Sequence, residues 1–239
     1  MESRAAIQPV RDERGKMLAV SEAVLRDACE QLGLQATTGR IDKLLILKDF
    51  FKFYARSMNL TGRADEAALN SHIVEALQVV ALAQRLGIGG GRWLDVGSGG
   101  GFPGLVLAAW LEVRLVLVEP RAKRASGLEL ALARIGRQDA KVLRGRVEAG
   151  KWKPIEGGAL EPGFDAASAR AVFAPERWVA EARPWVRPGG MICLHLGAGE
   201  VPPEGVRVLG RVDGDRWSAV GVENVPRGTV GAGEAGASV

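Results

Sequence analysis

The sequence is poor in the residues on which disulfide-bonded, metal-stabilised and membrane-spanning proteins depend. Only two of its 239 residues are cysteines, Cys29 and Cys193, and neither belongs to a CxxC motif or a cluster of cysteines and histidines. We therefore expect no disulfide scaffold, no metal site and a cytoplasmic location with reducing conditions. No apolar run approaches the length of about 18 residues that a membrane span needs, so we expect no membrane partner. Residues 1–16 lack the apolar core of a secretory signal.

Net charge and aromatic side chains are also scarce. The formal net charge is only +4, and aromatic residues make up 5% of the chain. A charge this small permits a nucleic-acid partner without demonstrating one, and no RNA-binding module with stacking aromatics is visible. The sequence also offers no pair of catalytic carboxylates and no Ser/His/Asp set, so it does not indicate general acid–base or covalent catalysis.

Glycine, by contrast, is abundant, with 32 residues in a composition typical of globular proteins. Helical periodicity dominates residues 1–88, which we expect to form an N-terminal helical region. From there, short apolar runs alternate with helical stretches, which predicts an open α/β sheet with right-handed crossovers over residues 89–225. Residues 226–239 are rich in glycine and alanine and are predicted to be a flexible tail.

The periodicity places the individual elements as follows. Helices are predicted at residues 21–32, 40–58, 65–86, 103–110, 121–135 and 175–186. Strands are predicted at residues 92–96, 115–119, 141–143, 164–169 and 191–196, with a closing antiparallel hairpin formed by residues 206–211 and 217–222.

A glycine-rich loop, DVGSGGGFPG at residues 95–104, follows the first predicted strand and fits two motifs. The GxGxxG fingerprint of dinucleotide-binding proteins fits its second half, and the DxGxGxG loop of S-adenosylmethionine-dependent methyltransferases fits its first half. A dinucleotide brings a pyrophosphate to this turn, where a carboxylate at the strand end is unfavourable. S-adenosylmethionine instead carries an ammonium and a sulfonium, which Asp95 attracts. The loop therefore predicts an S-adenosylmethionine site that includes Asp95, Gly97, Ser98 and Gly99.

Glu119 closes the second predicted strand, next to the strand that ends in the glycine loop. A carboxylate at this place in an α/β site accepts hydrogen bonds from ribose hydroxyls. We expect Glu119 to bind the cofactor in this way. The alternative is a surface acid at a strand end, but the pairing of Asp95 and Glu119 on two adjacent strands favours the functional interpretation.

A series of motifs, in the same order along the chain, resembles the RsmG (GidB) family. These are NLT at residues 59–61, HIVE at 72–75, LDVGSGGGFPG at 94–104, LVEPRAKR at 117–124, GRVE at 145–148 and ARAV at 169–172. The resemblance covers residues 40–200. It implies a Rossmann-like class I methyltransferase fold, with a mostly parallel seven-stranded sheet, an antiparallel last strand and a preceding helical region. It also implies that the protein uses S-adenosylmethionine to methylate N7 of a guanosine in 16S ribosomal RNA.

Carried over residue by residue, the resemblance places the cofactor against Gly97, Phe102, Val147 and Glu148, and near Arg170. Arg170 follows the fourth predicted strand, beside the point where the methyl group should emerge. It is the expected catalytic residue, with the cofactor carboxylate, an RNA phosphate or guanine O6 as its possible contacts. The expected partner is 16S rRNA or the small ribosomal subunit, and we expect a monomer.

The reaction explains why no general base is visible. Guanine N7 has an in-plane lone pair and loses no proton on methylation, so the protein's task is to align N7 with the methyl group. We therefore expect both histidines, His72 and His195, to be structural rather than catalytic.

Two departures from the family pattern fall on the substrate side. Leu196 stands where the family usually has a lysine, and residues 71–76, SHIVEA, replace a basic-His-x-x-Asp-Ser segment. These changes keep open two alternatives: a methyltransferase of another RNA or of a small molecule, and a non-catalytic ribosome-associated binding module.

Basic residues are concentrated in one part of the sheet region. Between Arg121 and Lys153 there are ten lysines and arginines against three acids. The stretch predicts a phosphate-binding footprint beside the site. A solvated helix face and loop is the alternative.

Overall fold

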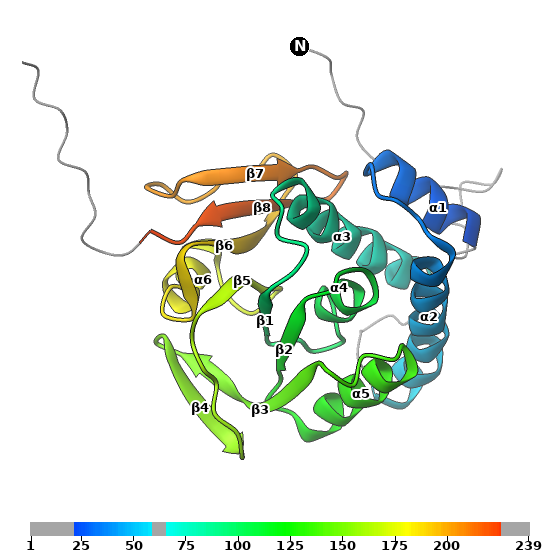
Figure 1. Cartoon of the computed structure of the whole chain (residues 1–239), viewed down its shortest axis with the longest axis horizontal. Coiled ribbons are helices and arrows are strands. Elements are labelled where there is room, and N and C mark those ends of the chain that lie inside the picture. The colour runs from blue at the N-terminus through cyan, green and yellow to red at the C-terminus, as the bar shows by residue number, and fades with distance from the viewer. Residues whose placement is uncertain (1–21, 59–65, 226–239) are drawn as a thin grey trace, which may run out of the picture.

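A twisted, open β-sheet covered by helices on both faces organises the chain (Figure 1). The computed structural model describes residues 22–58 and 66–225. The helices are α1 (Glu22–Gln31), α2 (Thr38–Met58), α3 (Glu66–Arg85), α4 (Gly104–Trp110), α5 (Ala122–Arg134) and α6 (Pro175–Ala182). The strands are β1 (Arg92–Val96), β2 (Arg114–Val118), β3 (Lys141–Glu148), β4 (Lys151–Glu156), β5 (Phe164–Ala169), β6 (Val186–Gly197), β7 (Val208–Val212) and β8 (Trp217–Glu223).

The strand order across the sheet is β4-β3-β2-β1-β5-β6-β8-β7. Strands β3, β2, β1, β5 and β6 are parallel to one another. The last strand, β8, runs antiparallel to β6, and β7 and β8 form the predicted closing hairpin. The chain crosses from β3 to β5 on the far side of β1, so the carboxyl ends of these strands flank a crevice where ligands of α/β proteins bind.

The predicted strand count of seven is wrong, because β4 makes the sheet eight-stranded. This strand pairs antiparallel with β3 at the edge of the sheet. Its sequence, KWKPIE, has three charged residues and a proline, and all of it except the half-buried Trp152 is exposed. An edge strand does not need a buried face, so periodicity gave no signal for it. Strand β3 is also longer than predicted and reaches Glu148.

The last predicted helix is too long. It ends at Ala182 because Pro184 cannot continue a helix, and β6 begins as early as Val186. Residues 226–239, predicted as a flexible tail, and the NLT motif at 59–61 lie outside the described residues.

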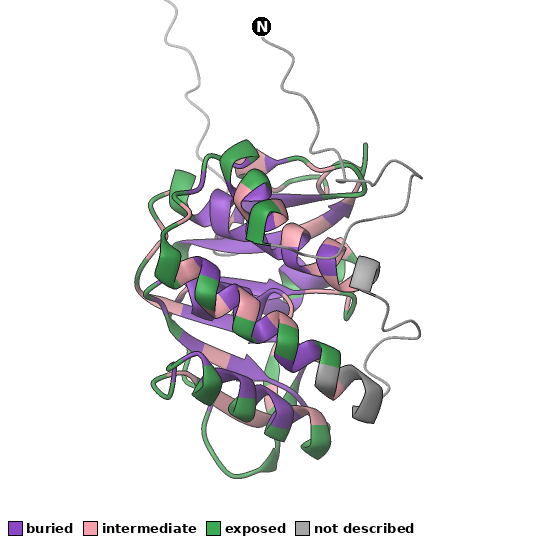
Figure 2. Ribbon diagram, turned by 90° about the vertical axis from the view of Figure 1, so that its right-hand side faces the viewer, coloured by how far each residue is buried: buried purple, intermediate pink, exposed green. Residues whose placement is uncertain are grey.

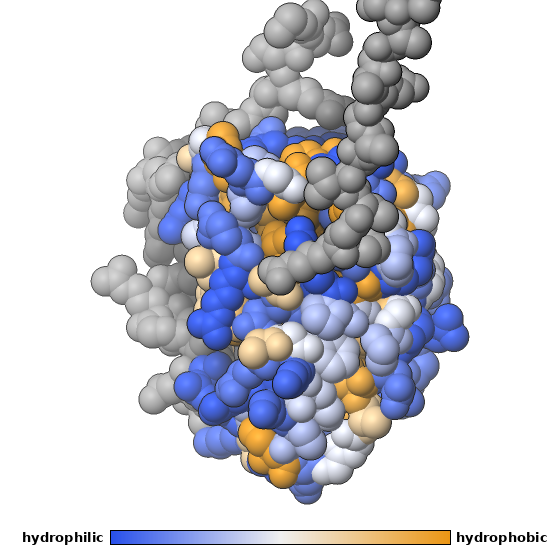
Figure 3. All heavy atoms as spheres, turned by 90° about the vertical axis from the view of Figure 1, so that its left-hand side faces the viewer, coloured by the Kyte–Doolittle hydropathy of each residue, from blue (hydrophilic) through white to orange (hydrophobic). Residues whose placement is uncertain are grey.

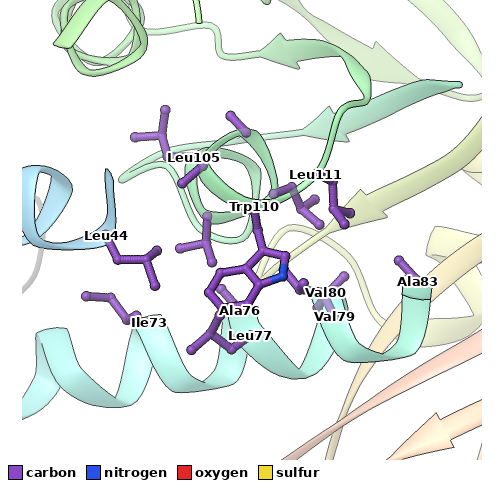
Figure 4. Close-up of a cluster of buried hydrophobic side chains, with 14 of the residues drawn as sticks. Leu44, Ile73, Ala76, Leu77, Val79, Val80, Ala83, Leu105, Trp110 and Leu111 are labelled. Carbon is purple, nitrogen blue, oxygen red and sulfur yellow. The ribbon is translucent and has the colours of Figure 1, made fainter. Parts of the chain in front are cut away.

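Amphipathic helices cover the sheet with their apolar sides turned inward (Figure 2). Trp110 of α4 belongs to the larger core, where it lies over Ala76 and Leu77 of α3 (Figure 4). The N-terminal helices thus share one hydrophobic cluster with the sheet. The boundary at residue 88 stays a prediction, but the two sides of it are packed together.

Helix α3 lies close against the β7–β8 hairpin. A Cβ added to Gly210 would lie 3.2 Å from Leu82. A Cβ at Gly214 would overlap the side-chain amide of Gln78. Gly210 and Gly214 therefore allow α3 to approach the hairpin as closely as it does.

The second core lies on the other face of the sheet, under α6, and includes Trp178 and Val179 of that helix. Seen from the side that carries α6 and β4, the surface is mainly hydrophilic, with small scattered apolar patches (Figure 3). Among the described residues no helix has the length and apolar character to cross a membrane, and no group of three or more side chains of the metal-ligating types comes together.

Candidate functional site

The glycine loop connects β1 to α4 at the carboxyl edge of the sheet. The N–H groups of Gly97 and Ser98 both donate to the carbonyl of Val118 in β2, at 2.8 and 3.0 Å. Gly97 has a φ of +69°, a conformation that disfavours any residue with a Cβ. A Cβ there would also overlap Val172, which covers the loop from the segment after β5. The loop is thus pinned to β2 on one side and closed by Val172 on the other.

Asp95 lies at the base of this loop and differs from the other predicted site residues. Its side chain is 1% exposed and does not form part of the cavity wall described below. Its Oδ1 accepts a hydrogen bond of 2.7 Å from Ser168, which in turn accepts one of 3.0 Å from the indole of Trp93. Burial raises the pKa of Asp95 to about 6, although the bond from Ser168 opposes the shift. Asp95 is thus buried beneath the glycine loop and does not reach the cavity surface.

The raised pKa of Asp95 makes the free energy of unfolding depend on pH. The folded chain holds this proton to higher pH than the unfolded chain, so stability falls as pH rises from about 4 to about 6 and is level above that. We expect the Asp95 contribution to the free energy of unfolding to decrease by about 3 kcal/mol across this window. The variant Asp95→Asn lacks this titrating group. Urea unfolding of the wild type and the variant at a series of pH values therefore measures the contribution of Asp95 to the free energy of unfolding. A pH-independent difference between the two proteins would show that Asp95 does not titrate here.

Glu119 is also held in place by the backbone. Its Oε2 accepts a hydrogen bond of 2.9 Å from Gly99 N–H, and its Oε1 accepts one of 2.8 Å from Arg121 N–H. The carboxylate is 3% exposed, and it lines the cavity. Each oxygen has further lone pairs, so Glu119 is pre-positioned to accept hydrogen bonds from two neighbouring hydroxyls.

Val147 and Glu148 end β3 and form the next part of the wall. Val147 is buried at 2% exposure, whereas Glu148 is exposed and lies 3.6 Å from the guanidinium of Arg146. Val118, at the end of β2, lines the same region. These strand ends offer an apolar surface with an acid at its rim.

Arg170 follows β5 and is held by two side chains of α3. Its Nη2 donates to Oε2 of Glu75 at 2.5 Å and lies 2.6 Å from Nδ1 of His72. Both contacts use Nη2, so Nε and Nη1 have no partner among residues 22–58 and 66–225. Burial lowers the pKa of Arg170, but the carboxylates of Glu75 and Asp95 oppose that shift. The guanidinium thus keeps donors available to a ligand.

One cavity of about 890 Å³ joins these residues. It brings together every predicted site residue except Asp95: Gly97, Ser98, Gly99, Phe102, Glu119, Val147, Glu148 and Arg170. Helices α2 and α3 contribute a wall that was not predicted from the sequence, and it consists of Phe51, Lys52, Leu69 and His72. The aromatic run on α2 was visible in the sequence, but nothing there showed that it faces the glycine loop.

A family model described as GidB, rRNA small subunit methyltransferase G, matches residues 40–200. That span includes the glycine loop, Glu119, Arg170 and the two α3 residues that hold Arg170. The chain belongs to this family. GidB-family proteins are S-adenosylmethionine-dependent methyltransferases of small-subunit ribosomal RNA.

Curated relatives carry the same description. The Ribosomal RNA small subunit methyltransferase G of Brucella ovis is 32% identical over 161 residues, which cover 65% of this chain and 70% of that protein. The protein of the same name from Brucella canis matches to the same extent.

Solved structures are similar to this GidB-family chain in fold. A variant of MtNAS in complex with S-adenosylmethionine has a TM-score of 0.50 at 15% identity, over 84% of each chain. The Escherichia coli protein yhhF has a TM-score of 0.50 at 12% identity, over 62% of this chain and 86% of its own. At these identities the likeness concerns the fold alone. Together with the strand order, it confirms the predicted class I methyltransferase fold.

The departures from the GidB pattern have structural explanations. Leu196 is fully buried in the core under α6, beside Leu194 and Val220, and does not line the cavity. Glu75, in the place of the family's aspartate, still reaches Arg170. Ala76, in the place of the serine, is buried in the larger core (Figure 4). Glu75 thus binds Arg170 in this chain, and Leu196 and Ala76 serve its hydrophobic cores.

Part of the basic stretch has a structural role. Arg137 is only 6% exposed and donates to the carbonyl groups of Ala108, Leu111 and Val113 at 2.5 to 2.8 Å. These carbonyls lie at the carboxyl end of α4 and just beyond it, where backbone acceptors lack helical partners. Arg144 forms an ion pair with Glu156 across the β3–β4 hairpin.

Three other basic residues of the stretch, Arg121, Arg124 and Arg146, line the cavity. Lys153 lies directly opposite Arg146 across the β3–β4 pairing. Two cations directly opposite each other on a sheet repel. A bound anion would relieve that repulsion, and the phosphate footprint stays a prediction for these residues.

Proposed function

We propose that this GidB-family chain transfers the methyl group of S-adenosylmethionine to N7 of a guanosine in 16S ribosomal RNA. One observation carries the proposal: a single cavity contains a fixed carboxylate, Glu119, on the loop side and a clamped guanidinium, Arg170, on the α3 side. The first suits a ligand with ribose hydroxyls, and the second suits an anionic or carbonyl oxygen.

The residues present fit S-adenosylmethionine. Glu119 is tied to Gly99 N–H and still has acceptor capacity for the ribose diol. Val118 and Val147 supply an apolar wall suited to adenine, and Glu148 lies at its rim. The negative field of Asp95 favours a cationic ligand above the loop.

When bound, S-adenosylmethionine supplies an electrophilic methyl group. The residues of the chain then have to orient the guanine, since N7 loses no proton and needs no base. Arg170 is positioned to do this through Nε and Nη1, which α3 leaves unused. An orientation effect of this kind lowers the barrier by several kcal/mol, on the order of 7–11 at best.

The surroundings of the cavity fit ribosomal RNA. Lys52 of α2, Arg121, Arg124 and Arg146 surround the cavity with cations from three separate elements. Phosphate contacts of this kind position a nucleic acid without reading its sequence. We further propose that the protein acts as a monomer in the cytoplasm, where its substrate is assembled.

The test is a comparison of 16S rRNA with and without the gene. Deletion of the gene in the source bacterium should abolish one 7-methylguanosine in digests of 16S rRNA, measured by mass spectrometry, and the wild-type gene should restore it. The purified protein should methylate small subunits from the deletion strain with labelled S-adenosylmethionine. Persistence of 7-methylguanosine at every 16S position in the deletion strain would refute the proposal.

A further inference from the structure

His72 and Arg170, which the sequence analysis assigned to unrelated roles, touch each other. Arg170 Nη2 lies 2.6 Å from Nδ1 of His72. A guanidinium has N–H donors and no acceptor, so Nδ1 is the acceptor of this hydrogen bond. An imidazole that accepts at Nδ1 carries its N–H on Nε2.

The surroundings of His72 leave its Nε2–H group available to donate a hydrogen bond to a ligand. The side chain is 29% exposed and lines the cavity, and Nε2 has no hydrogen-bond partner in the part of the chain that the structure describes. The ring of Phe102 lies 5.5 Å away and is itself packed on Phe51 at 4.7 Å. The imidazole is thus fixed by Arg170 at one end and by aromatic rings at its side.

The cavity wall beside α3 consequently offers N–H donors from His72 and from Arg170, whereas Glu75, whose Oε2 accepts from Arg170, does not line the cavity. Guanine presents two acceptors on the edge that includes N7, and these are N7 and O6. If N7 receives the methyl group, O6 is the remaining acceptor on that edge. Adenine carries an amino donor at the same place.

We propose that His72 is a specificity-determining residue for the target base, and that its Nε2–H donates a hydrogen bond to guanine O6. The proposal rests on the proposed function, since it concerns the base that the same site methylates. An N–H donor here selects guanine over adenine, because two donors facing each other would leave both groups unpaired. Arg170 acts in the same interaction by fixing the tautomer of His72.

Two variants test the roles of the two ring nitrogens of His72, Nδ1 and Nε2, separately. In His72→Asn the amide oxygen reaches the place of Nδ1 and accepts from Arg170, but no atom reaches the place of Nε2. In His72→Gln the amide reaches the place of Nε2 and restores a donor there. We expect His72→Asn to lower kcat/KM for small subunits about tenfold or more, with the Kd for S-adenosylmethionine changed by no more than about twofold. His72→Gln should retain more kcat/KM than His72→Asn.

The measurements are initial rates with labelled S-adenosylmethionine, calorimetric binding of the cofactor, and thermal unfolding of each variant. Wild-type kcat/KM in His72→Asn would overturn the proposal. Equal losses of cofactor affinity and turnover, or a lower kcat/KM in His72→Gln than in His72→Asn, would also overturn it. If the wild-type protein forms no 7-methylguanosine on small subunits, both this proposal and the proposed function fail.

Discussion

Arg170→Ala is expected to lower kcat/KM for methylation of the small subunit by at least about a hundredfold, the loss typical when an oriented donor is removed from an active site. Stability should fall as well. Glu75 is 11% exposed in its side chain, and without Arg170 its carboxylate is left without its cation. Breaking a buried pair in this way costs about 3 kcal/mol or more. The two effects are measured by initial rates and by urea unfolding.

Glu75→Gln in the same background separates these effects. The double variant removes the unpaired charge, so it should recover most of the lost stability of Arg170→Ala and none of the lost turnover. Recovery of turnover together with stability would mean that Arg170 acts only through folding. Near-wild-type turnover in Arg170→Ala itself would remove Arg170 from the active site.

Gly97→Ala is expected to lower the affinity for S-adenosylmethionine on the order of a hundredfold, because displacement of binding groups by about 1 Å has effects of this size. The residue at 97 has a φ of +69°, which costs a residue with a Cβ about 1–2 kcal/mol. The new methyl group would also overlap Val172 and push it from its place over the loop. Calorimetric titration of the folded variant measures the loss.

Gly100→Ala is the matched control in the same loop. Gly100 also lines the cavity, but a Cβ there would have no neighbour within 4 Å. We expect its cofactor affinity to stay within about twofold of the wild type. If Gly100→Ala weakened binding as strongly as Gly97→Ala, the loop would be intolerant of any side chain, and the specific role of Val172 would be wrong.

The sequence predicted the sheet and the loop side of the cavity because both depend on local signals. Apolar runs such as LVLV in β2 identify buried strands, and the DxGxGxG spacing identifies the turn that follows β1. Parallel strands bring their carboxyl ends to one edge, so the approach of Glu119 to Gly99 followed from the fold class alone.

The α3 side of the cavity was not predictable in the same way. His72 and Arg170 are separated by nearly a hundred residues, and their contact depends on how α3 packs across the sheet. Asp95 illustrates a second limit of sequence-based prediction. Its residue type and its place at a strand end predicted a site residue, but its position beneath the cavity wall depends on the hydrogen bond from Ser168 of another strand. Edge strand β4 shows a third limit. An almost entirely exposed strand leaves no alternation of apolar and polar residues in the sequence.

The close packing of α3 on the β7–β8 hairpin has a consequence for genetics. The helix that binds Arg170 through Glu75 rests, through Gln78 and Leu82, on Gly214 and Gly210 of the hairpin. Larger residues at these two glycines would shift the helix and carry Glu75 away from Arg170, although no residue of the cavity wall is substituted. A screen for spontaneous mutants that have lost rRNA methylation should therefore recover substitutions in this distant hairpin as well as at the glycine loop.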